Sequence, residues 1–409
     1  MQVKETRLNP SLLQRIAQRQ VFAVLEELQG AGLTIEQDGI HTFFGDQHAD
    51  LQATVEVKNP VFFWRALVGG SIGAAESFVE EQWQTEDLCA VLQVFARCLP
   101  VVERLEKRFA WLRKPVNLWV RYRNRNTRDG SRTNIAAHYD LGNAMYEHFL
   151  DPLMQYSSAI FPNTDATLEQ AQEHKLQSIC EQLQLKPTDH LLEIGTGWGG
   201  LACYAAKHYG CRVTTTTISN EQYKVATKRA VEMGVADQIT FLLQDYRDLH
   251  GQYDKIVSIE MIEAVGHEYF GEYFACLDRH LQPEGLLLIQ AITIADQRYD
   301  SYRNSVDFIN RYIFPGGCLP SVSEMLLQLR QRTSLQLRHI ETFGDDYAQT
   351  LRIWHQRFNA QASALAKLGY NEDFQRLWRF YFCYCEAGFR ENTIDLVHFV
   401  CRRQYSTTK

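Results

Sequence analysis

The stretch that most constrains the fold of this chain is residues 190–200, which read HLLEIGTGWGG. A short apolar run leads into glycines at alternate positions, Gly195, Gly197 and Gly199, and an alanine-rich segment follows over residues 201–208. This order predicts a strand, a tight turn and a helix. Because glycine carries no side chain and accepts left-handed backbone angles, a ligand can approach the backbone and the helix N-terminus there.

The glycine pattern by itself leaves more than one ligand open. Gly195, Gly197 and Gly200 also satisfy the G-x-G-x-x-G of a dinucleotide site. A nicotinamide site uses an acid at the end of the second strand to hold a ribose hydroxyl, whereas the second predicted strand, residues 211–218 (CRVTTTTI), ends in threonines. An acid just before the glycines, Glu193, favours the S-adenosylmethionine loop of a methyltransferase. A glycine turn that binds no ligand is the third interpretation.

Length and composition indicate a globular protein of two domains. At 409 residues the chain exceeds the size that one core usually serves, and its 45% hydrophobic and 22% charged residues are ordinary values. No apolar run approaches the roughly 18 residues of a membrane span, and the first ten residues are polar, so we expect a cytoplasmic protein. The net charge of −7 excludes a generally basic nucleic-acid binder.

The cysteines and the first third of the chain show no catalytic cluster. The ten cysteines form no C-x-x-C pair, so we expect buried thiols and no metal site. Residues 12–33 look helical, residues 39–57 alternate as short strands do, and a glycine-broken aromatic run follows residue 60. We predict three regions: an N-terminal lipid-binding or accessory α+β domain (1–118), a basic linker (119–135) and an S-adenosylmethionine-dependent catalytic domain (136–409).

Residues 104–132 are strongly basic, with ten lysines or arginines and only two acids. Aromatic and aliphatic residues are interleaved with these cations, although Pro115 breaks any single helix. Such a mixture is attracted to an anionic membrane surface, where each nearby cation contributes roughly 1 kcal/mol. A solvated linker between domains is the alternative interpretation.

From about residue 138 the pattern becomes that of an α/β protein. Strands are predicted at residues 190–194, 211–218, 239–243, 254–259 and 285–293. Helices are predicted at residues 168–185, 199–208, 219–233 and 268–281. This alternation is typical of a doubly wound sheet, in which ligands lie beyond the carboxyl ends of the strands.

Eight stretches, in this order, resemble the cyclopropane fatty acid synthases and their mycolic acid relatives. They are HYDLGN (138–143), LDPLMQYSSAIF (150–161), LLEIGTGWGG (191–200), TISNEQ (217–222), LQDYRDL (243–249), EMIEAVGHE (260–268), YIFPGGCLPS (312–321) and FGDDYAQTL (343–351). The resemblance covers roughly residues 55–403. It implies an α/β fold, the Rossmann-like class I S-adenosylmethionine methyltransferase with a seven-stranded, mostly parallel sheet, beside a smaller N-terminal α+β domain.

The resemblance also implies a reaction. In this family the methyl group of S-adenosylmethionine passes to a cis double bond in a phospholipid acyl chain, and a carbocation develops. Loss of a proton from the new methyl closes a cyclopropane ring, with a bicarbonate ion, held by a cysteine, a glutamate, a histidine, a tyrosine and a backbone amide, as the proton acceptor. Such a cation needs a water-free site with a base beside it. Homodimerisation and peripheral association with the inner face of the membrane are expected as well.

The family's site residues are carried over position by position. The cofactor positions are Tyr156, Ser157, Gly195, Gly197, Thr217, Ile218, Gln222, Asp245 and Tyr246. The catalytic positions are Glu263, Tyr347, Ser158, Gln290 and the backbone amide of Ile292. Ser158 stands where the commonest bacterial pattern has a cysteine, and Gln290 where it has a histidine; both are neutral and can hydrogen-bond an anion. With these departures, Glu263 itself becomes a candidate to accept the proton or orient a water molecule.

Other interpretations remain open at this point. An altered base site is also consistent with a fatty acyl C-methyltransferase that stops at a methyl or methylene branch. A lipid-binding homologue that has lost catalysis is a third hypothesis. Glu263 could simply cap the helix that follows it, Gln290 could be an ordinary buried amide, and Tyr347 could line the acyl channel.

Overall fold

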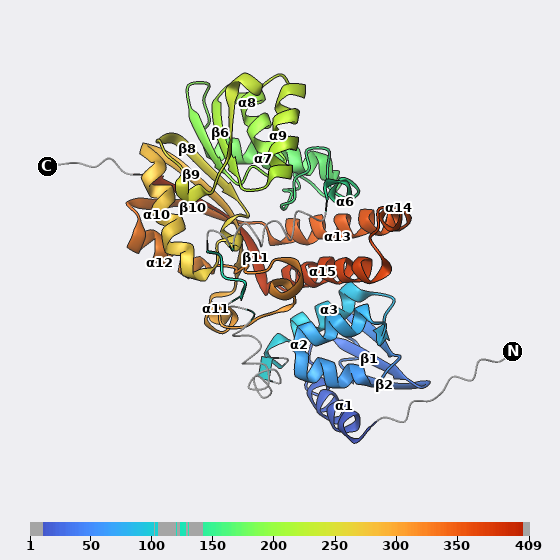
Figure 1. The fold of residues 1–409 in the computed structure, drawn as a ribbon. Helices are drawn as coiled ribbons and strands as arrows, with labels where there is room; N and C mark the ends of the chain where they lie inside the picture. Colours follow the sequence, from blue (N-terminus) through green and yellow to red (C-terminus); the bar gives the residue numbers. More distant parts are fainter. Residues whose placement is uncertain are drawn as a thin grey trace. The chain divides into compact units, whose positions relative to one another are not determined.

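In the computed structural model, residues 11–101, 103–104, 120, 123–127, 130 and 142–403 are described, and the chain forms two compact units (Figure 1). The first unit comprises residues 1–120, 306–311 and 362–391, and the second comprises residues 121–305, 312–361 and 392–409. The basic segment 104–132 lies largely outside the described residues. The expected domain boundaries at residues 118 and 135 also fall on residues that are not described, so these boundaries stay predictions.

The first unit is built on a four-stranded sheet with the order β2-β1-β3-β4. Its strands are β1 (Gly32–Gln37), β2 (Ile40–Gly45), β3 (Gln52–Val57) and β4 (Trp83–Gln84). Its helices are α1 (Leu12–Leu25), α2 (Val61–Val79), α3 (Leu88–Arg97), α14 (Ala362–Lys367) and α15 (Glu372–Arg390). The strands expected over residues 39–57 are confirmed. The helix expected over residues 12–33 is wrong beyond Leu25, because Gly30 has a φ of 67° and β1 begins at Gly32, burying Leu33 and Ile35.

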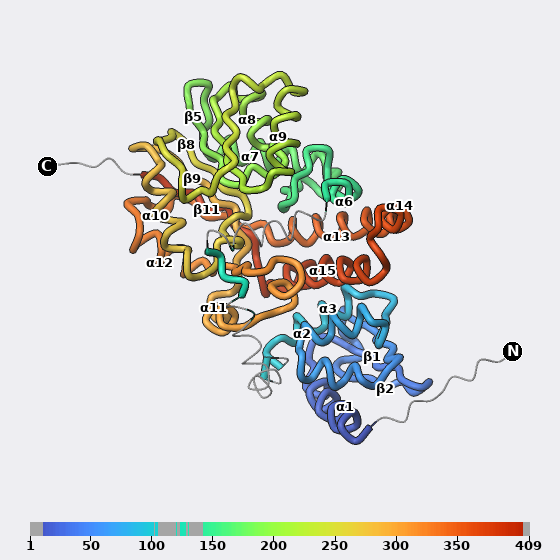
Figure 2. The backbone as a smooth tube through the Cα atoms, in the orientation of Figure 1, coloured from blue at the N-terminus to red at the C-terminus, as the bar shows by residue number. Residues whose placement is uncertain are grey.

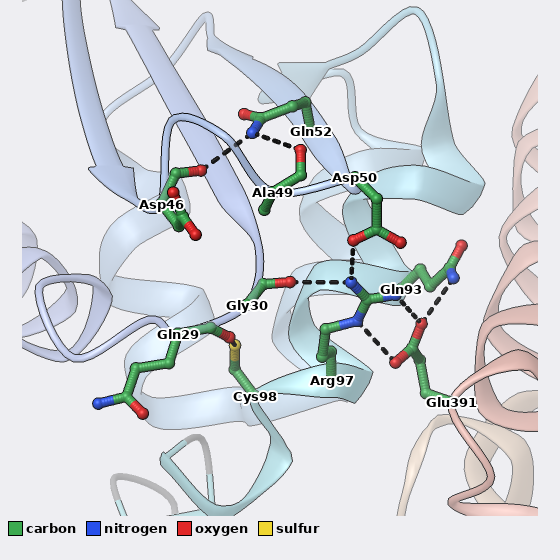
Figure 3. A network of polar contacts seen from close by, with 10 residues as sticks. All are labelled: Gln29, Gly30, Asp46, Ala49, Asp50, Gln52, Gln93, Arg97, Cys98 and Glu391. Carbon is green, nitrogen blue, oxygen red and sulfur yellow. Dashed lines mark hydrogen bonds and ion pairs between the residues drawn. The ribbon is translucent and has the colours of Figure 1, made fainter.

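Helix α15 belongs to this first unit although it lies late in the sequence. It packs against α2 and α3, and the tube view shows the red α15 beside the blue α3 (Figure 2). At the end of α3, the Arg97 guanidinium donates to both carboxylate oxygens of Glu391, at 2.8 and 2.9 Å, and also to Gly30 and Asp50, each at 2.8 Å (Figure 3). This network ties the residue that follows α15 to the N-terminal sheet.

The second unit contains a seven-stranded sheet with the order β10-β11-β9-β8-β5-β6-β7. Its strands are β5 (His190–Ile194), β6 (Arg212–Thr217), β7 (Ile239–Leu243), β8 (Tyr253–Ile259), β9 (Leu281–Ile294), β10 (Leu335–Thr342) and β11 (Ile394–Arg403). Strand β11 pairs antiparallel with both of its neighbours, and the other pairings are parallel. The expected seven-stranded, mostly parallel sheet is therefore confirmed.

Helices cover both faces of this sheet (Figure 1). They are α6 (Asn143–Glu147), α7 (Leu168–Gln182), α8 (Gly200–Tyr209), α9 (Asn220–Glu232), α10 (Phe270–His280), α11 (Asp296–Tyr302), α12 (Val322–Arg332) and α13 (Gly344–Ala360). Successive residues of one strand point to opposite cores: Leu191 packs with α7 and α8, and Leu192 packs with α10 and α12. Both faces of the central strands are thus apolar, as a doubly wound sheet requires.

Short turns connect these elements and position several site residues. They are η1 (Ala236–Gln238), η2 (Tyr246–Asp248), η3 (Ile262–Ala264), η4 (His267–Tyr269) and the π-helical turn η5 (Ile309–Ile313). In the part of the chain that the structure describes, no helix has the length and apolar character needed to cross a bilayer.

Candidate active site

The glycine loop between β5 and α8 contains two kinds of glycine. Gly195, Gly197 and Gly199 have φ angles of 98°, 52° and 84°, in the left-handed region that favours glycine. A Cβ on Gly199 would lie 2.9 Å from the Cβ of Ala226, so this position allows α8 and α9 to pack closely. A Cβ on Gly197 would meet no atom within 4 Å, and one on Gly195 would only touch Met261. Open space therefore lies beside the backbone at Gly197, and at Gly195 only the Met261 side chain is in contact distance.

The acid before the glycines is turned into the sheet. Glu193 is 3% exposed, and burial raises the pKa of its carboxyl to about 8. It accepts a hydrogen bond of 2.6 Å from the Thr215 hydroxyl, which also lies 2.7 Å from the Thr196 hydroxyl in the loop. Glu193 thus links β5 to β6 beneath the glycine loop.

The other expected cofactor residues lie at the carboxyl ends of β6, which neighbours β5, and of β7, which neighbours β6. Thr217 ends β6 and donates to Gln222 Oε1 at 2.8 Å, and Ile218 follows it. Asp245 and Tyr246 follow β7. Because parallel strands end at one edge, the fold brings these residues to the edge where Gly195 and Gly197 lie.

Asp245 is strongly paired within its own turn. Its two carboxylate oxygens accept hydrogen bonds from the Arg247 guanidinium at 2.8 and 2.7 Å, and both side chains are only 5% exposed. The Arg247 guanidinium also lies 5.5 Å from the centre of the Tyr246 ring. Asp245 Oδ1 also accepts the backbone amide of Arg247 at 3.0 Å, so the turn fixes the orientation of this carboxylate.

Tyr156 and Ser157 belong to the loop before α7 and are held by different partners. The Tyr156 ring contacts the Trp354 ring, with centroids 5.4 Å apart. The Ser157 hydroxyl accepts a hydrogen bond of 2.8 Å from the ammonium of Lys175, which also donates to Gln155 Oε1 at 3.2 Å. Lys175 has no exposed surface, and burial lowers the pKa of its ammonium to about 8.

Three of the expected catalytic residues meet at a carboxylate that the sequence analysis did not assign, that of Glu260. Glu260 Oε1 accepts hydrogen bonds from the Ser158 backbone amide at 2.9 Å and from Gln290 Nε2 at 2.8 Å. Glu260 Oε2 accepts one of 2.6 Å from the Tyr347 hydroxyl. Ser158, Gln290 and Tyr347 come from a loop, from β9 and from α13, so the tertiary fold assembles this site.

The backbone at Glu260 is strained. Its φ is 47°, a left-handed value that costs a residue with a side chain roughly 1–2 kcal/mol. The Glu260 amide donates to the Gln290 carbonyl at 2.8 Å, which extends the pairing of β8 with β9 by one residue. Strained residues of this kind cluster at functional sites.

Glu263 lies one turn further on, in η3, and has a different environment. Its Oε1 accepts a hydrogen bond of 2.5 Å from the backbone amide of Ile292, the amide that the resemblance assigns to the bound anion. Its Oε2 is buried and has no hydrogen-bond partner among the described residues. Burial, and then the charge of Glu260, raise the pKa of the Glu263 carboxyl to about 8. At neutral pH, Glu263 is therefore mainly protonated.

Gln290 is held by side chains on the neighbouring strand, not by backbone groups alone. Its Oε1 lies 3.0 Å from His398 Nε2, and His398 Nδ1 lies 3.1 Å from the amide nitrogen of Gln182. Burial lowers the pKa of His398 to about 3, so its ring is neutral. With Nδ1 accepting from Gln182, the ring proton sits on Nε2 and faces Gln290 Oε1. This arrangement turns the NH₂ group of Gln290 toward Glu260.

Two polar residues of the site, Glu260 and Lys175, were missed from the sequence. For Lys175 a signal existed: it falls on the apolar face of α7 with Leu168, Ala171 and Ile179, where a charge is unusual. Glu260 directly follows a buried strand, the position where ligand-facing residues are expected. Among the described residues, no group of His, Cys, Asp and Glu side chains could hold a metal ion.

The fold and the loop together define the class of this protein. A seven-stranded, mostly parallel sheet with one antiparallel strand, and an open glycine loop after its central strand β5, fit an S-adenosyl ligand. The solved structure of coclaurine N-methyltransferase bound to SAH has the same fold, with a TM-score of 0.60 at 17% identity, covering 82% of this chain and 99% of that one. The protein has the class I fold of the S-adenosylmethionine-dependent methyltransferases, as expected.

The more similar proteins identify the family. Residues 126–399 match the mycolic acid cyclopropane synthetase family. The cyclopropane-fatty-acyl-phospholipid synthase of Escherichia coli K12 is 40% identical, over 86% of this chain and 88% of its own. The tuberculostearic acid methyltransferase UfaA1 of Mycobacterium tuberculosis is 38% identical, over 82% and 79%. The structure of cyclopropane synthase MmaA2 from Mycobacterium tuberculosis has a TM-score of 0.62 at 30% identity, covering 66% of this chain and 98% of that one. The chain belongs to the mycolic acid cyclopropane synthetase family.

Proposed function

We propose that this enzyme transfers the methyl group of S-adenosylmethionine to the cis double bond of an unsaturated phospholipid acyl chain and forms a cyclopropane ring. The observation that carries the proposal is the pair of buried carboxyls beyond β8, Glu260 and Glu263, with the donors that converge on them. Met261, between the two, touches the space beside Gly195. A base is therefore available next to the place where the methyl donor fits.

The residues of the glycine edge are proposed to bind the methyl donor. When bound, S-adenosylmethionine supplies an electrophilic methyl group. Gly195 and Gly197 leave room for it, and Tyr156 and Ser157 face its methionine part. Thr217, Ile218 and Gln222 are proposed to contact its ribose, and Asp245 and Tyr246 its adenine.

The buried cluster is proposed to handle the charge and the proton of the reaction. Ser158 and Gln290 have no exposed surface and Tyr347 is 5% exposed, so these side chains exclude water on their side of the site. A carbocation formed there is shielded from hydroxide and water, which would add to it. Glu263 and the Ile292 amide, which are hydrogen-bonded to each other, complete the proposed catalytic set.

The test is expression in a bacterium that lacks its own cyclopropane synthase, followed by mass spectrometry of the fatty acid methyl esters. The proposal predicts acyl chains heavier by one CH₂ and without a double bond. A gain of one CH₂ with a retained double bond would instead establish a methylene branch, the outcome of a fatty acyl C-methyltransferase. Two observations favour that second candidate: the 38% identity to a tuberculostearic acid methyltransferase, and the Ser158 and Gln290 departures. Unchanged fatty acids would support a lipid-binding homologue and refute both.

Location and assembly form a separate proposal. We propose that the enzyme acts from the cytoplasm at the inner face of the membrane as a homodimer, and that the first unit helps it to bind lipid. The basic composition of residues 104–132 supports attraction to anionic lipid. Replacing Arg121, Arg123, Arg125 and Arg128 by serine is expected to weaken binding to anionic vesicles, most at low salt. Unchanged vesicle binding would refute the membrane role of this segment.

A further inference from the structure

We propose that Glu260 takes the place of an external anion in this enzyme and that its side-chain carboxylate is the base that accepts the proton during ring closure. The inference rests on the proposed function and deepens it. It concerns which group holds the negative charge at the centre of the catalytic cluster.

The first argument is occupancy. The resemblance assigns a bound bicarbonate ion to the positions of Ser158, Gln290, Tyr347, Glu263 and the Ile292 amide. In this chain the Ser158 backbone amide, the Gln290 side chain and the Tyr347 hydroxyl already donate to one protein carboxylate, at 2.9, 2.8 and 2.6 Å. The Ser158 hydroxyl donates to the Ala159 carbonyl at 2.8 Å instead. The Ile292 amide is bonded to Glu263 at 2.5 Å. A bicarbonate ion would have to displace Glu260, so the residues present do not fit it.

The second argument is the distribution of charge between the two acids. Glu260 accepts three hydrogen bonds and interacts with the ammonium of Lys175, and all of these oppose the effect of burial on the pKa of its carboxyl. Glu263 accepts one hydrogen bond from Ile292 and is affected by the charge of Glu260, so its own pKa lies near 8. Burial still leaves the pKa of Glu260 raised, but three donors and a cation stabilise its charged form, whereas one donor stabilises that of Glu263. The pair therefore places its negative charge on Glu260.

The third argument is position. Glu260 directly follows β8, at the carboxyl end of that strand where ligands of this fold lie, and its donor residues Ser158 and Gln290 are completely buried. The left-handed backbone at Glu260 directs the side chain into this position at the end of β8.

The proposed step is balanced. The π electrons of the alkene form the bond to the methyl carbon, and the S–CH₃ bond breaks with its electron pair kept by the sulfur of the leaving S-adenosylhomocysteine. The positive charge then lies on the other former alkene carbon. A Glu260 oxygen removes one proton from the new methyl, and the electron pair of the broken C–H bond forms the bond from the methyl carbon to the cationic carbon. Glu260 is then a neutral acid, and it returns its proton to water after the product leaves.

Gln290 and His398 are positioning residues in this scheme. The neutral His398 ring holds the Gln290 amide in the orientation that donates to Glu260. Reversal of the amide would place its oxygen against a carboxylate oxygen, which is repulsive. The site therefore needs no charged histidine to hold its base.

The experiment uses the purified full chain with vesicles of dioleoyl phosphatidylglycerol in CO₂-depleted buffer, with and without 10 mM added bicarbonate, on the order of physiological levels. We expect the wild-type rate to be the same in both. We expect Glu260→Gln to lower kcat by at least about 100-fold, the lower end of general-base contributions, with SAH affinity unchanged by calorimetry. Bicarbonate dependence of the wild type, or near-normal kcat in Glu260→Gln, would overturn the proposal.

A rescue variant separates a base from a merely structural carboxylate. Glycine accepts the left-handed angle of residue 260 without strain, so Glu260→Gly leaves three donors facing a small space. We expect formate or bicarbonate to restore its activity at least roughly 10-fold, with saturation, and to leave the wild type unaffected. The same anions should raise the Tm of Glu260→Gly and not that of the wild type. An equal rise in both proteins would overturn the proposal.

The same measurements distinguish failure of this inference from failure of the proposed function. If the wild type modifies no lipid in either buffer, the cyclopropane proposal fails. Anion binding to Glu260→Gly, and its absence in the wild type, would still decide whether Glu260 occupies the anion site. Failure of the rescue variant to bind formate or bicarbonate refutes the site itself.

Discussion

Replacing Tyr347 by phenylalanine isolates one hydrogen bond to Glu260. The change removes only the hydroxyl, whose distance to Glu260 Oε2 is 2.6 Å, and keeps the ring that packs against Trp354. A hydrogen bond to a buried charged group contributes about 1.5–3 kcal/mol. Since about 1.4 kcal/mol corresponds to one pKa unit, the loss is expected to raise the pKa of Glu260 by roughly one to two units.

The assay is the dependence of kcat on pH. Deprotonation of Glu260 gives the profile its acidic limb, and the charged or titratable groups that face it are Glu263, Lys175 and the Tyr347 hydroxyl. In Tyr347→Phe we expect the limb to move to higher pH by the same one to two units. Turnover below the limb then falls roughly 10- to 100-fold, and above the limb it returns toward the wild-type value.

The matched control is Tyr253→Phe. Tyr253 lies in β8, and its hydroxyl donates to the His250 carbonyl at 3.1 Å, away from Glu260. This variant loses a neutral hydrogen bond and is expected to keep the wild-type pH profile. If Tyr347→Phe loses activity equally at every pH, or loses none, the hydroxyl does not stabilise a catalytic carboxylate and the argument for Glu260 as the base is refuted.

Three further predictions follow from the same geometry. Folding raises the pKa of Glu263 from 4.5 to about 8, so the contribution of this acid to stability is full below about pH 4.5 and falls as the pH rises to about 8, by on the order of 5 kcal/mol at most. The Tm difference between the wild type and Glu263→Gln should fall over that window and level off above it. A Tm difference that does not change with pH would contradict the buried acid. Gly197→Ala should weaken SAH binding at least roughly 10-fold by calorimetry, with a small loss of Tm. The control Gly234→Ala, at a residue with φ +71° and equally open surroundings, should lose similar stability and no affinity. Equal SAH affinities of the two variants would contradict a ligand at Gly197. Lys175→Met removes the cation that lowers the pKa of Glu260, so kcat should fall at pH 7 and recover at higher pH, and a pH-independent loss would indicate a purely structural lysine.

The central sheet was predictable because its strands are covered on both faces. Strands β5 to β9 appear in the sequence as short apolar or, for β6, threonine-rich runs, and each was expected within a few residues of its observed bounds apart from the early start of β9 at Leu281. Strands β10 and β11 were not located, although β11 lies inside the sheet and is buried along most of its length. For β10 the reason is exposure. It lies at the edge of the sheet and has mostly exposed residues (LQLRHIET), so its pattern does not differ from that of a loop.

The partner of an amphipathic helix was harder to predict. The aromatic residues of α15 indicate an apolar face, but their pattern does not say which surface covers it. In the structure this face packs within the first unit, where Phe380 contacts Phe78 at 5.9 Å and Phe308 at 4.8 Å between ring centroids. An apolar stripe predicts burial, but it does not identify the surface that buries it.

The candidate site likewise has one part that the sequence predicts and one part that only the fold shows. The glycine loop is local, so its left-handed turn could be predicted from consecutive residues. The role of Glu260 depends on partners 102, 30 and 87 residues away, namely Ser158, Gln290 and Tyr347. A carboxylate at the end of a strand is ordinary in sequence, and only the fold shows that three donors converge on it.

The two departures from the bacterial pattern have one explanation if Glu260 is the base. A free anion must be captured from dilute solution, which requires donors strong enough to offset its lost translational freedom and hydration. A carboxylate attached to the chain loses that freedom during folding, so its effective concentration at the site is high. Neutral donors such as the Gln290 amide and a backbone amide are then sufficient to hold it. The Glu260→Gly variant must again capture an anion from solution. Its neutral donors should therefore bind bicarbonate only weakly, and rescue should half-saturate only at a high bicarbonate concentration.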